Sequence, residues 1–267
     1  MKPMAGTAER CDRFAVVALL CSLMLATAAV GPATAAGCSF QPQGEGRVAA
    51  VIDARSFRLG DGREIRLTGI EPAAAETAKD ASALAAIVAG REVTLQGEDD
   101  TPDRYGRQPA FVFVAPSEAP VQAQLLAQGA ALASGTVADR DCAAVLMAAE
   151  AAGRTARQGV WNEPSAIKNA ESPGDILTGI GRFAVVEGRV LSVRQAGATT
   201  YLNFGRNWTR DFAVTISRRM LPAFAAAGIV IKSFENRRIR VRGFIEARGG
   251  PRIDVLHVGQ LELLGGT

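Results

Sequence analysis

Residues 51–73 read V-I-D-A-R-S-F-R-L-G-D-G-R-E-I-R-L-T-G-I-E-P-A, and this stretch decides the fold. Between its two halves, residues 60–62 read Gly-Asp-Gly, residue types that tolerate the positive φ angles of a tight hairpin turn. Apolar side chains recur on either side of that turn with the two-residue spacing of a strand that buries one face: Ile52, Phe57, Leu59, Ile65 and Leu67. The pattern predicts a β-hairpin.

A second piece of sequence belongs with the hairpin. Residues 103–107 read D-R-Y-G-R, a polar loop with two arginines shortly before an apolar strand at residues 110–114. Together the two pieces resemble the staphylococcal nuclease (thermonuclease) family. That family has an Asp-Gly-Asp-Thr turn, then an arginine in a strand ending in Ile-Asp-Ala-Pro-Glu, then Asp-Xaa-Tyr-Gly-Arg. Arg66 falls on the strand arginine and Arg107 on the second arginine, and the last motif is matched in full.

The resemblance implies both a fold and a chemistry. It covers nearly all of residues 44–161 and implies a five-stranded OB-type β-barrel with packed helices, an α+β architecture. Family members that cleave nucleic acid use a calcium ion held by carboxylates, an acidic group that helps to activate water, and two arginines. Attack on a phosphodiester builds negative charge at the phosphorus centre. Guanidinium groups held in place can bind that charge through two parallel hydrogen bonds. Arg66 and Arg107 are therefore the catalytic residues that the resemblance implies.

Two of the three family motifs are damaged where the metal would bind. The Asp-Gly-Asp-Thr turn falls on residues 53–56, and Arg55 stands in place of its second carboxylate. A unit charge about 4 Å from a dication repels it by roughly 8 kcal/mol at an effective dielectric of about 20, an upper bound for a side chain that can turn away. In the strand, Glu71 replaces the family's aspartate, and alanine replaces the glutamate expected after the proline.

The damaged motifs leave Asp53 and Glu71 as weak candidate calcium ligands, too few for a cation that needs several oxygen donors. We predict a barrel that keeps a phosphate-binding arginine pair and has reduced or lost hydrolysis. No cofactor is expected, and calcium only if the nuclease interpretation holds. A second interpretation stays open, in which Arg66 and Arg107 pair with carboxylates such as Asp53, Glu71 or Asp103 and hold loops in place.

The N-terminal residues have the composition of an export signal. Basic residues precede a charge-free, mostly apolar run at residues 14–30, and a small-residue cleavage pattern follows at residues 33–35. This predicts a signal peptide over residues 1–36, an exported protein that is periplasmic or secreted, and no membrane span in the mature chain. Two alternatives are a transmembrane anchor and a lipid anchor at Cys38, because residues 35–38 loosely fit a lipid-attachment site.

Cleavage of the signal would change the cysteine count. Cys11 and Cys21 would leave with it, so that Cys38 and Cys142 remain. Two cysteines in an oxidising compartment predict one disulfide, between the mature N-terminus and a helix. The alternative is two unrelated buried thiols.

The remaining chain divides by composition into two domains of opposite charge. Asn, Glu, Pro, Ser and Gly crowd together without apolar periodicity at residues 162–181, which predicts a linker between domains at residues 44–161 and 182–264. Residues 37–177 carry 13 basic and 19 acidic side chains, whereas residues 178–267 carry 14 basic and 6 acidic ones. A polyanion, nucleic acid above all, is therefore the partner expected for the C-terminal half.

Periodicity gives the expected elements of both domains. In the first, helices are expected at residues 74–88, 121–128 and 141–157, and strands at residues 92–95 and 108–114. In the second, strands are expected at residues 183–194, 200–204, 211–216, 237–247 and 252–256, with a helix at residues 218–227. Five strands with a helix after the third is the OB order. Two tandem OB-fold-like barrels are the expected architecture.

Two features of the basic domain are candidate nucleic-acid-binding sites. Residues 237–247 alternate, and one strand face is expected to carry Arg238, Arg240, Arg242 and Phe244. The alternative is a solvated face with salt bridges to Glu246 or Glu235. Further upstream, Trp208 lies outside any apolar pattern, close in sequence to Arg206 and Arg210, and is a candidate for stacking on bases. The alternative there is a tryptophan that plugs the end of its own barrel.

Three functions stay open at this point. The first is an exported thermonuclease-like protein that binds nucleic acid or another polyanion. The second is an active calcium-dependent phosphodiesterase, an endonuclease cleaving DNA or RNA. The third is a cell-envelope module that binds a protein or a glycan, since a fold does not fix a function. The sequence leaves the oligomeric state open.

Overall fold

The strands of the predicted hairpin form part of a closed five-stranded barrel. The computed structural model describes residues 40–73 and 78–265. In the barrel, β3 and β6 are parallel neighbours and the other pairs are antiparallel. Around the barrel the strands follow the order β1 (Gln41–Asp53), β2 (Ser56–Leu59), β3 (Glu64–Leu67), β6 (Arg107–Phe113) and β5 (Glu92–Gly97). The barrel implied by the resemblance is confirmed.

The period-two pattern of the hairpin is confirmed on β2 and β3 but not on β1. Four of its apolar side chains fill the barrel core, each stabilising the fold by roughly 1.5–3 kcal/mol: Phe57, Leu59, Ile65 and Leu67. Ile52 is instead 44 % exposed. The β1–β2 register shifts between Val51 and Asp53, and such a bulge turns a side chain away from the face that spacing predicts.

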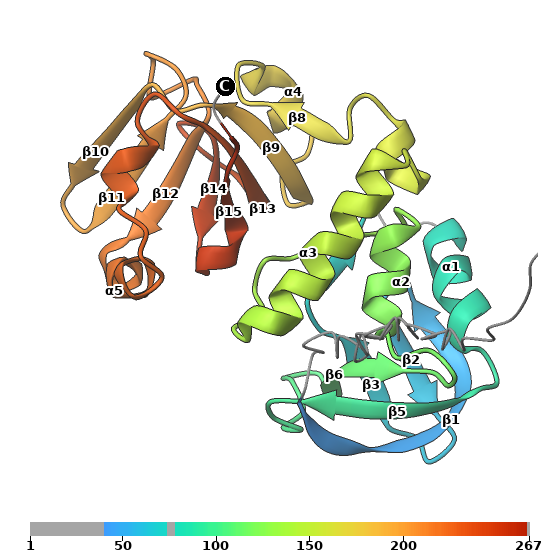
Figure 1. The fold of residues 1–267 in the computed structure, drawn as a ribbon. Helices are drawn as coiled ribbons and strands as arrows, with labels where there is room; N and C mark the ends of the chain where they lie inside the picture. The colour runs from blue at the N-terminus through green and yellow to red at the C-terminus, as the bar shows by residue number, and fades with distance from the viewer. Residues whose placement is uncertain (1–39, 74–77, 266–267) are drawn as a thin grey trace, which may run out of the picture. The chain divides into compact units, whose positions relative to one another are not determined.

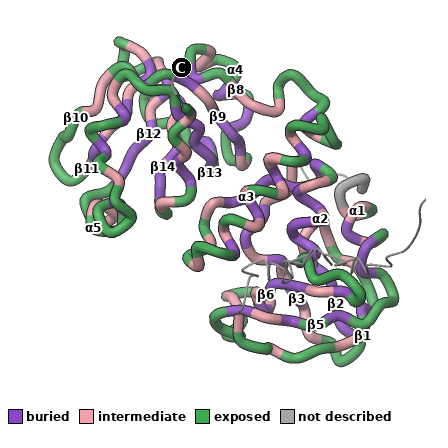
Figure 2. Tube along the Cα trace, viewed as in Figure 1, coloured by how far each residue is buried: buried purple, intermediate pink, exposed green. Residues whose placement is uncertain are grey.

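Three helices accompany the barrel, close to where periodicity predicts them: α1 (Ala78–Val88), α2 (Val121–Ala127) and α3 (Arg140–Thr155). Helix α2 packs against α3 (Figure 1), and most of its residues are buried (Figure 2). Three short elements complete this part of the chain, none of which the periodicity predicts: β4 (Ile70–Pro72), β7 (Ala131–Ala133) and the 3-10 helix η1 (Gly159–Asn162).

The C-terminal half forms an eight-stranded sheet. Its order is β10-β11-β12-β14-β13-β9-β8, and β15 pairs with β13 off that path. The strands are β8 (Ile167–Asn169), β9 (Phe183–Arg189), β10 (Ser192–Ala196), β11 (Thr199–Asn203), β12 (Ala213–Ser217), β13 (Arg238–Arg248), β14 (Gly250–Val255) and β15 (Leu261–Leu263). The helices are α4 (Pro173–Leu177) and α5 (Leu221–Ala226), with 3-10 turns η2 (Arg218–Met220), η3 (Ile231–Phe234) and η4 (Val258–Gln260).

This sheet repeats the strand order of the barrel. Its first strand is the pair β9 and β10, interrupted only by Val190 and Leu191, and the third strand, β12, lies parallel to the fifth, β14. A helix separates the third and fourth strands in both halves, α1 in one and α5 in the other. The predicted order is therefore present. The order of pairing runs from β10 to β9, the two segments of that one strand, so the path returns to the strand at which it starts.

The structure differs from the prediction of a linker at residues 162–181. Strand β8 pairs in parallel with β9, and helix α4 follows it directly. Ala170 and Ile176 are buried in the core of the second sheet, so the segment is part of that sheet. These two apolar residues, which stand among Pro, Ser and Gly residues, anchor the segment to the sheet.

The described residues 40–73 and 78–265 group into one compact unit, and residues 1–36 lie outside the described part of the chain. The signal-peptide prediction over residues 1–36 therefore stays a prediction. None of the helices in the described part of the chain has the length and hydropathy needed to cross a membrane.

Candidate functional site

Three arginines meet at one edge of the barrel, and we call Arg55, Arg66 and Arg107 the arginine cluster. Arg55 lies in the turn between β1 and β2, Arg66 on β3, and Arg107 at the first residue of β6. β3 and β6 are parallel neighbours, and Ser56, next to Arg55, pairs with Arg66 across the β2–β3 ladder. The two arginines implied by the resemblance are thus held on adjacent strands.

The loop before β6 fixes Arg107. The Asp103 carboxylate accepts hydrogen bonds from the Arg107 side chain, at 2.8 Å from Nη2 and 3.0 Å from Nε, and from the backbone N–H groups of Tyr105 and Arg107. The hydrogen bond from Arg107 is the main reason that the pKa of Asp103 falls to about 2. Gly106 completes the loop at φ +79°, a left-handed conformation that favours glycine. Tyr105 is 64 % exposed, and the guanidinium groups of Arg104 and Arg107 lie over its ring.

Arg66 differs from its two neighbours because no carboxylate is paired with it directly, although Glu71 and Asp103 act on its charge from farther away. Within the part of the chain that the structure describes, its side chain has no hydrogen-bond or ion-pair partner. Partial burial lowers the pKa of Arg66, and the positive charges of Arg55 and Arg107 lower it further. A half-buried guanidinium between two others is stabilised by a bound anion, because such an anion offsets both the lost hydration and the repulsion.

The donor groups near this cluster do not fit a calcium ion. Arg55 donates a short ion-paired hydrogen bond to Glu71, and both side chains are largely buried. The Asp53 carboxylate accepts from the backbone N–H of Arg55 at 2.9 Å. Both weak candidate ligands are therefore engaged by Arg55, and Glu71 faces a cation where it would need to face the metal. Burial, moreover, raises the pKa of Glu71. Among the described residues, no three acidic, His or Cys side chains group in a way that could hold a metal ion.

The arginine face predicted on β13 is largely covered. Arg240 is buried and pairs with Glu187 at 2.6 Å and with Glu262 at 2.7 Å. Arg242 is fully buried and donates to both oxygens of Glu150, at 2.9 and 3.0 Å, and to Glu262. The prediction that these two side chains bind nucleic acid is wrong, because neighbouring strands and α3 supply carboxylates that cover them. Of the carboxylates weighed from the sequence, neither Glu246 nor Glu235 is their partner.

Two side chains of the same strand, Arg238 and Phe244, remain accessible. Arg238 is exposed and lies 3.7 Å from Glu187, a distance typical of a weak surface pair. Phe244 is half-exposed and packs edge-on against Phe183, with ring centroids 5.4 Å apart. Arg238 is the first residue of β13 and Phe244 lies near its middle, and the buried Arg240 and Arg242 separate them, so the strand has no continuous exposed row. The predicted basic platform on β13 is therefore absent.

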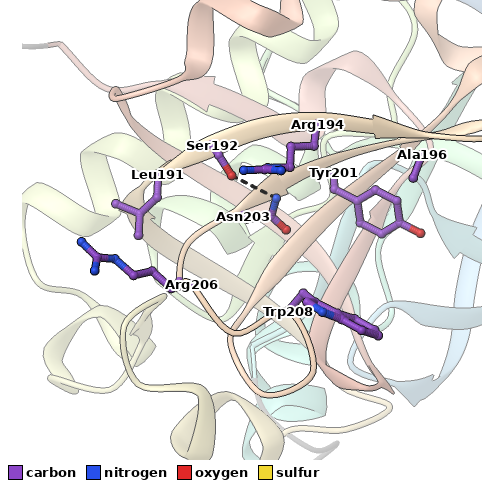
Figure 3. Close-up of a pocket in the computed structure, with 9 residues that line it drawn as sticks. Leu191, Ser192, Arg194, Ala196, Tyr201, Asn203, Arg206 and Trp208 are labelled. Atoms are coloured by element: carbon purple, nitrogen blue, oxygen red, sulfur yellow. Dashed lines mark hydrogen bonds between the residues drawn. The ribbon is translucent and has the colours of Figure 1, made fainter.

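Trp208 is the most accessible large apolar side chain in the described residues, at 78 % exposure. It does not plug a barrel, which removes the alternative weighed from the sequence. Trp208 and Arg206 line a hollow of about 810 Å³, whereas Arg210 lines a different one beside α4. We call the first hollow the β10–β11 pocket, and six of its side chains carry polar, charged or aromatic groups: Ser192, Arg194, Tyr201, Asn203, Arg206 and Trp208 (Figure 3).

Sequence reasoning overlooked two sets of residues. The buried carboxylate of Glu150 gave no signal other than its place in an otherwise alanine-rich helix. Arg194 and Tyr201 were recognisable only as members of a hairpin, since their common pocket depends on the β10–β11 pairing. Cys142 is buried on α3, and its predicted disulfide partner, Cys38, lies outside the described residues. That disulfide therefore stays a prediction.

The barrel topology and the arginine cluster define a class of protein, the nuclease-like barrels of OB type. Residues 64–163 match the family model described as staphylococcal nuclease homologue. This segment is therefore similar to staphylococcal nuclease homologues, a family whose function is of nuclease or nucleic-acid-binding type. The matched segment contains Arg66 and Arg107 and starts beyond Arg55, so the altered turn lies outside it. No curated protein matches the chain.

Proposed function

We propose that the barrel binds a phosphate group of nucleic acid, or of another polyanion, and that its metal-dependent hydrolysis is reduced or lost. The observation that carries this proposal is the half-buried Arg66, which has no partner among the described residues and stands between Arg55 and Arg107. A phosphate placed there would accept charge-assisted hydrogen bonds from Arg66 and share Arg107 with Asp103.

The same contacts supply the reason for weak or absent hydrolysis. Arg55 holds Glu71 in an ion pair with its guanidinium group, and its backbone N–H donates to Asp53. The arginines can still bind and orient a phosphate. Glu71 is paired with Arg55, so this buried carboxylate is not free to accept a proton from an attacking water.

Replacing Arg66 with alanine is expected to weaken binding of a labelled oligonucleotide about tenfold. A hydrogen bond to a charged group contributes about 1.5–3 kcal/mol, and 1.4 kcal/mol corresponds to a factor of ten. Fluorescence anisotropy at one fixed salt concentration measures the change, since charge-driven affinities depend steeply on salt. Arg58→Ala is the matched control, because Arg58 is an exposed arginine on β2 that pairs with Glu64. Equal losses in both variants would count against a specific site.

A plasmid-degradation assay decides between binding and catalysis. Protein with added calcium and protein with a chelator are expected to leave the plasmid equally intact. Robust calcium-dependent cleavage that Arg66→Ala abolishes would instead establish an active phosphodiesterase. If wild-type protein shows no salt-sensitive oligonucleotide binding, the remaining interpretation is a cell-envelope module that binds a protein or a glycan.

We propose further that the protein is exported, to the periplasm or out of the cell. The support is the basic, then apolar, then small-residue order of residues 1–36. Cell fractionation with N-terminal sequencing of the mature protein tests it. A mature N-terminus that begins at a lipid-modified Cys38 would replace the soluble form with an anchored one.

A further inference from the structure

The β10–β11 pocket presents the exposed indole of Trp208 on a loop whose backbone is ordered by hydrogen bonds. The Asn207 side chain accepts hydrogen bonds from the backbone and hydroxyl of Thr209, and Asp211 accepts from the backbone of Asn207 at 2.7 Å. A Cβ atom at Gly205 would lie 2.0 Å from the Asp211 carboxylate, so the loop is tightly packed on its inner side. A fixed, exposed ring loses little conformational entropy when a ligand stacks on it.

The arrangement of the pocket suits a flat ring joined to an anion. In the view of Figure 3, the rings of Tyr201 and Trp208 lie at one end and Arg206 at the other, with Ser192 and Asn203 between them. The Asn203 amide donates to the Ser192 hydroxyl at 3.2 Å, which orients the amide between the rings and the arginine. A volume of about 810 Å³ lies within the range of small-molecule sites, which is about 300–1,000 Å³.

The charge of the pocket selects for an anion. Its lining includes Arg194 and Arg206 and no carboxylate. Neither arginine forms a hydrogen bond or an ion pair among residues 40–73 and 78–265, in contrast to the three paired arginines of β13. Two arginines without a directly paired carboxylate, beside the exposed ring of Trp208, favour a ligand that carries both a phosphate and a base.

We propose that the β10–β11 pocket binds single-stranded nucleic acid, with a base stacked on Trp208 and the adjoining phosphates on Arg194 and Arg206. A duplex keeps its bases stacked on one another and offers only its phosphates to such a site. A neutral glycan could stack on the rings but would leave both cations unused. The pocket is separate from the arginine cluster of the barrel. It takes a base together with the adjoining phosphates, whereas the cluster takes a phosphate and no base.

Tryptophan fluorescence tests this proposal directly. The chain has two tryptophans, and Trp161 is only 7 % exposed, so quenching by an added polymer reports on Trp208. Full-length mature protein is titrated with a thymidine decamer at low salt, then with a duplex of equal length and with a neutral oligosaccharide. The decamer is expected to quench the signal in a salt-sensitive way, and the other two are expected to quench it much less.

Variants assign the binding to the pocket. Measured by anisotropy of the labelled decamer, Trp208→Ala is expected to weaken binding about tenfold, Trp208→Phe much less, and Arg206→Ala several-fold. Arg219→Ala is the matched control, because Arg219 is exposed on η2 and does not line the pocket. Quenching by the decamer is expected to persist in Arg66→Ala, which separates this site from the one in the barrel.

Several results would overturn the proposal. Equal quenching by duplex, or by the neutral oligosaccharide, would show that the pocket does not select single strands. Unchanged decamer affinity in Trp208→Ala would remove the stacking contact. Loss of quenching in Arg66→Ala, with Trp208 intact, would place the binding at the arginine cluster alone.

Discussion

Replacing Arg242 with alanine is expected to lower the free energy of unfolding by about 3–5 kcal/mol. The guanidinium is fully buried and donates to Glu150, to Glu262 and to the backbone carbonyl of Ala133. Removal of one partner of a buried ion pair leaves the other as an uncompensated charge in a medium of low polarity, and the loss is of this size. Urea unfolding of wild type and variant measures the change.

The matched control lies on the same strand. Arg238→Ala removes an exposed arginine whose nearest carboxylate oxygen, on Glu187, is 3.7 Å away, and its expected cost is below about 1 kcal/mol. Glu150→Gln provides a second check, because the amide oxygen can still accept from the Ala133 N–H that Glu150 accepts now. It is expected to cost less than Arg242→Ala. Similar costs for Arg238→Ala and Arg242→Ala would show that burial of the pair does not matter.

Replacing Arg55 with aspartate is expected to create calcium binding that the wild-type protein lacks. The change removes the cation that holds Glu71 and adds a carboxylate between Asp53 and Glu71. Two units of charge change beside a dication, so a gain of at least about a hundredfold in calcium affinity is expected, which is about 2.7 kcal/mol. Thermal unfolding with and without millimolar calcium measures it, because a ligand of the native state raises the midpoint.

The calcium-free variant supplies an internal control. Without calcium, Arg55→Asp should unfold more easily than wild type, because Glu71 is largely buried and loses its partner. Arg55→Gln also loses that pair but gains no carboxylate, so calcium should not restore its stability. If calcium stabilises the wild-type protein as much as Arg55→Asp, then Arg55 is not what closes the metal site.

Hydrolysis is not expected to return with the metal. Alanine still stands after Pro72, where the family has the glutamate that helps to activate water. An Arg55→Asp protein that binds calcium and does not cleave DNA would separate the two losses. The metal site and the acidic group would then be two independent defects of one motif.

The sequence predicted the barrel well because its signals are local. Alternation around residues 60–62 is a property of neighbouring residues, and it placed Phe57, Leu59, Ile65 and Leu67 in the core. The arginine at position 55 likewise led to the prediction of a damaged metal site, and the structure shows that Arg55 is paired with Glu71. The absence of an apolar pattern around Trp208 is also a local property, but it left open whether the ring was accessible or plugged the end of a barrel.

The failed predictions depend on contacts that are distant in the sequence. A period of two says that Arg240 and Arg242 share a face of β13, but it does not say what covers that face. The covering carboxylate of Glu150 is 92 residues away from Arg242. Arg210 lies two residues beyond Trp208 and was grouped with it, yet the turn through Thr209 and Asp211 sends it to another hollow. Which side chains become neighbours in these cases depends on how the strands pair in the folded sheet.

The buried contact between Arg242 and Glu150 also predicts how a shortened form of the protein would behave. A fragment that stopped at residue 163, where the family match ends, would keep Glu150 and lose the arginine that neutralises it. It would also uncover Leu132 and Trp161, which pack with Val185 of β9. The recognisable nuclease-like portion is therefore not self-sufficient. Its recombinant expression alone should yield an aggregating or partly folded polypeptide, whereas residues 37–267 together should give a cooperative unfolding transition.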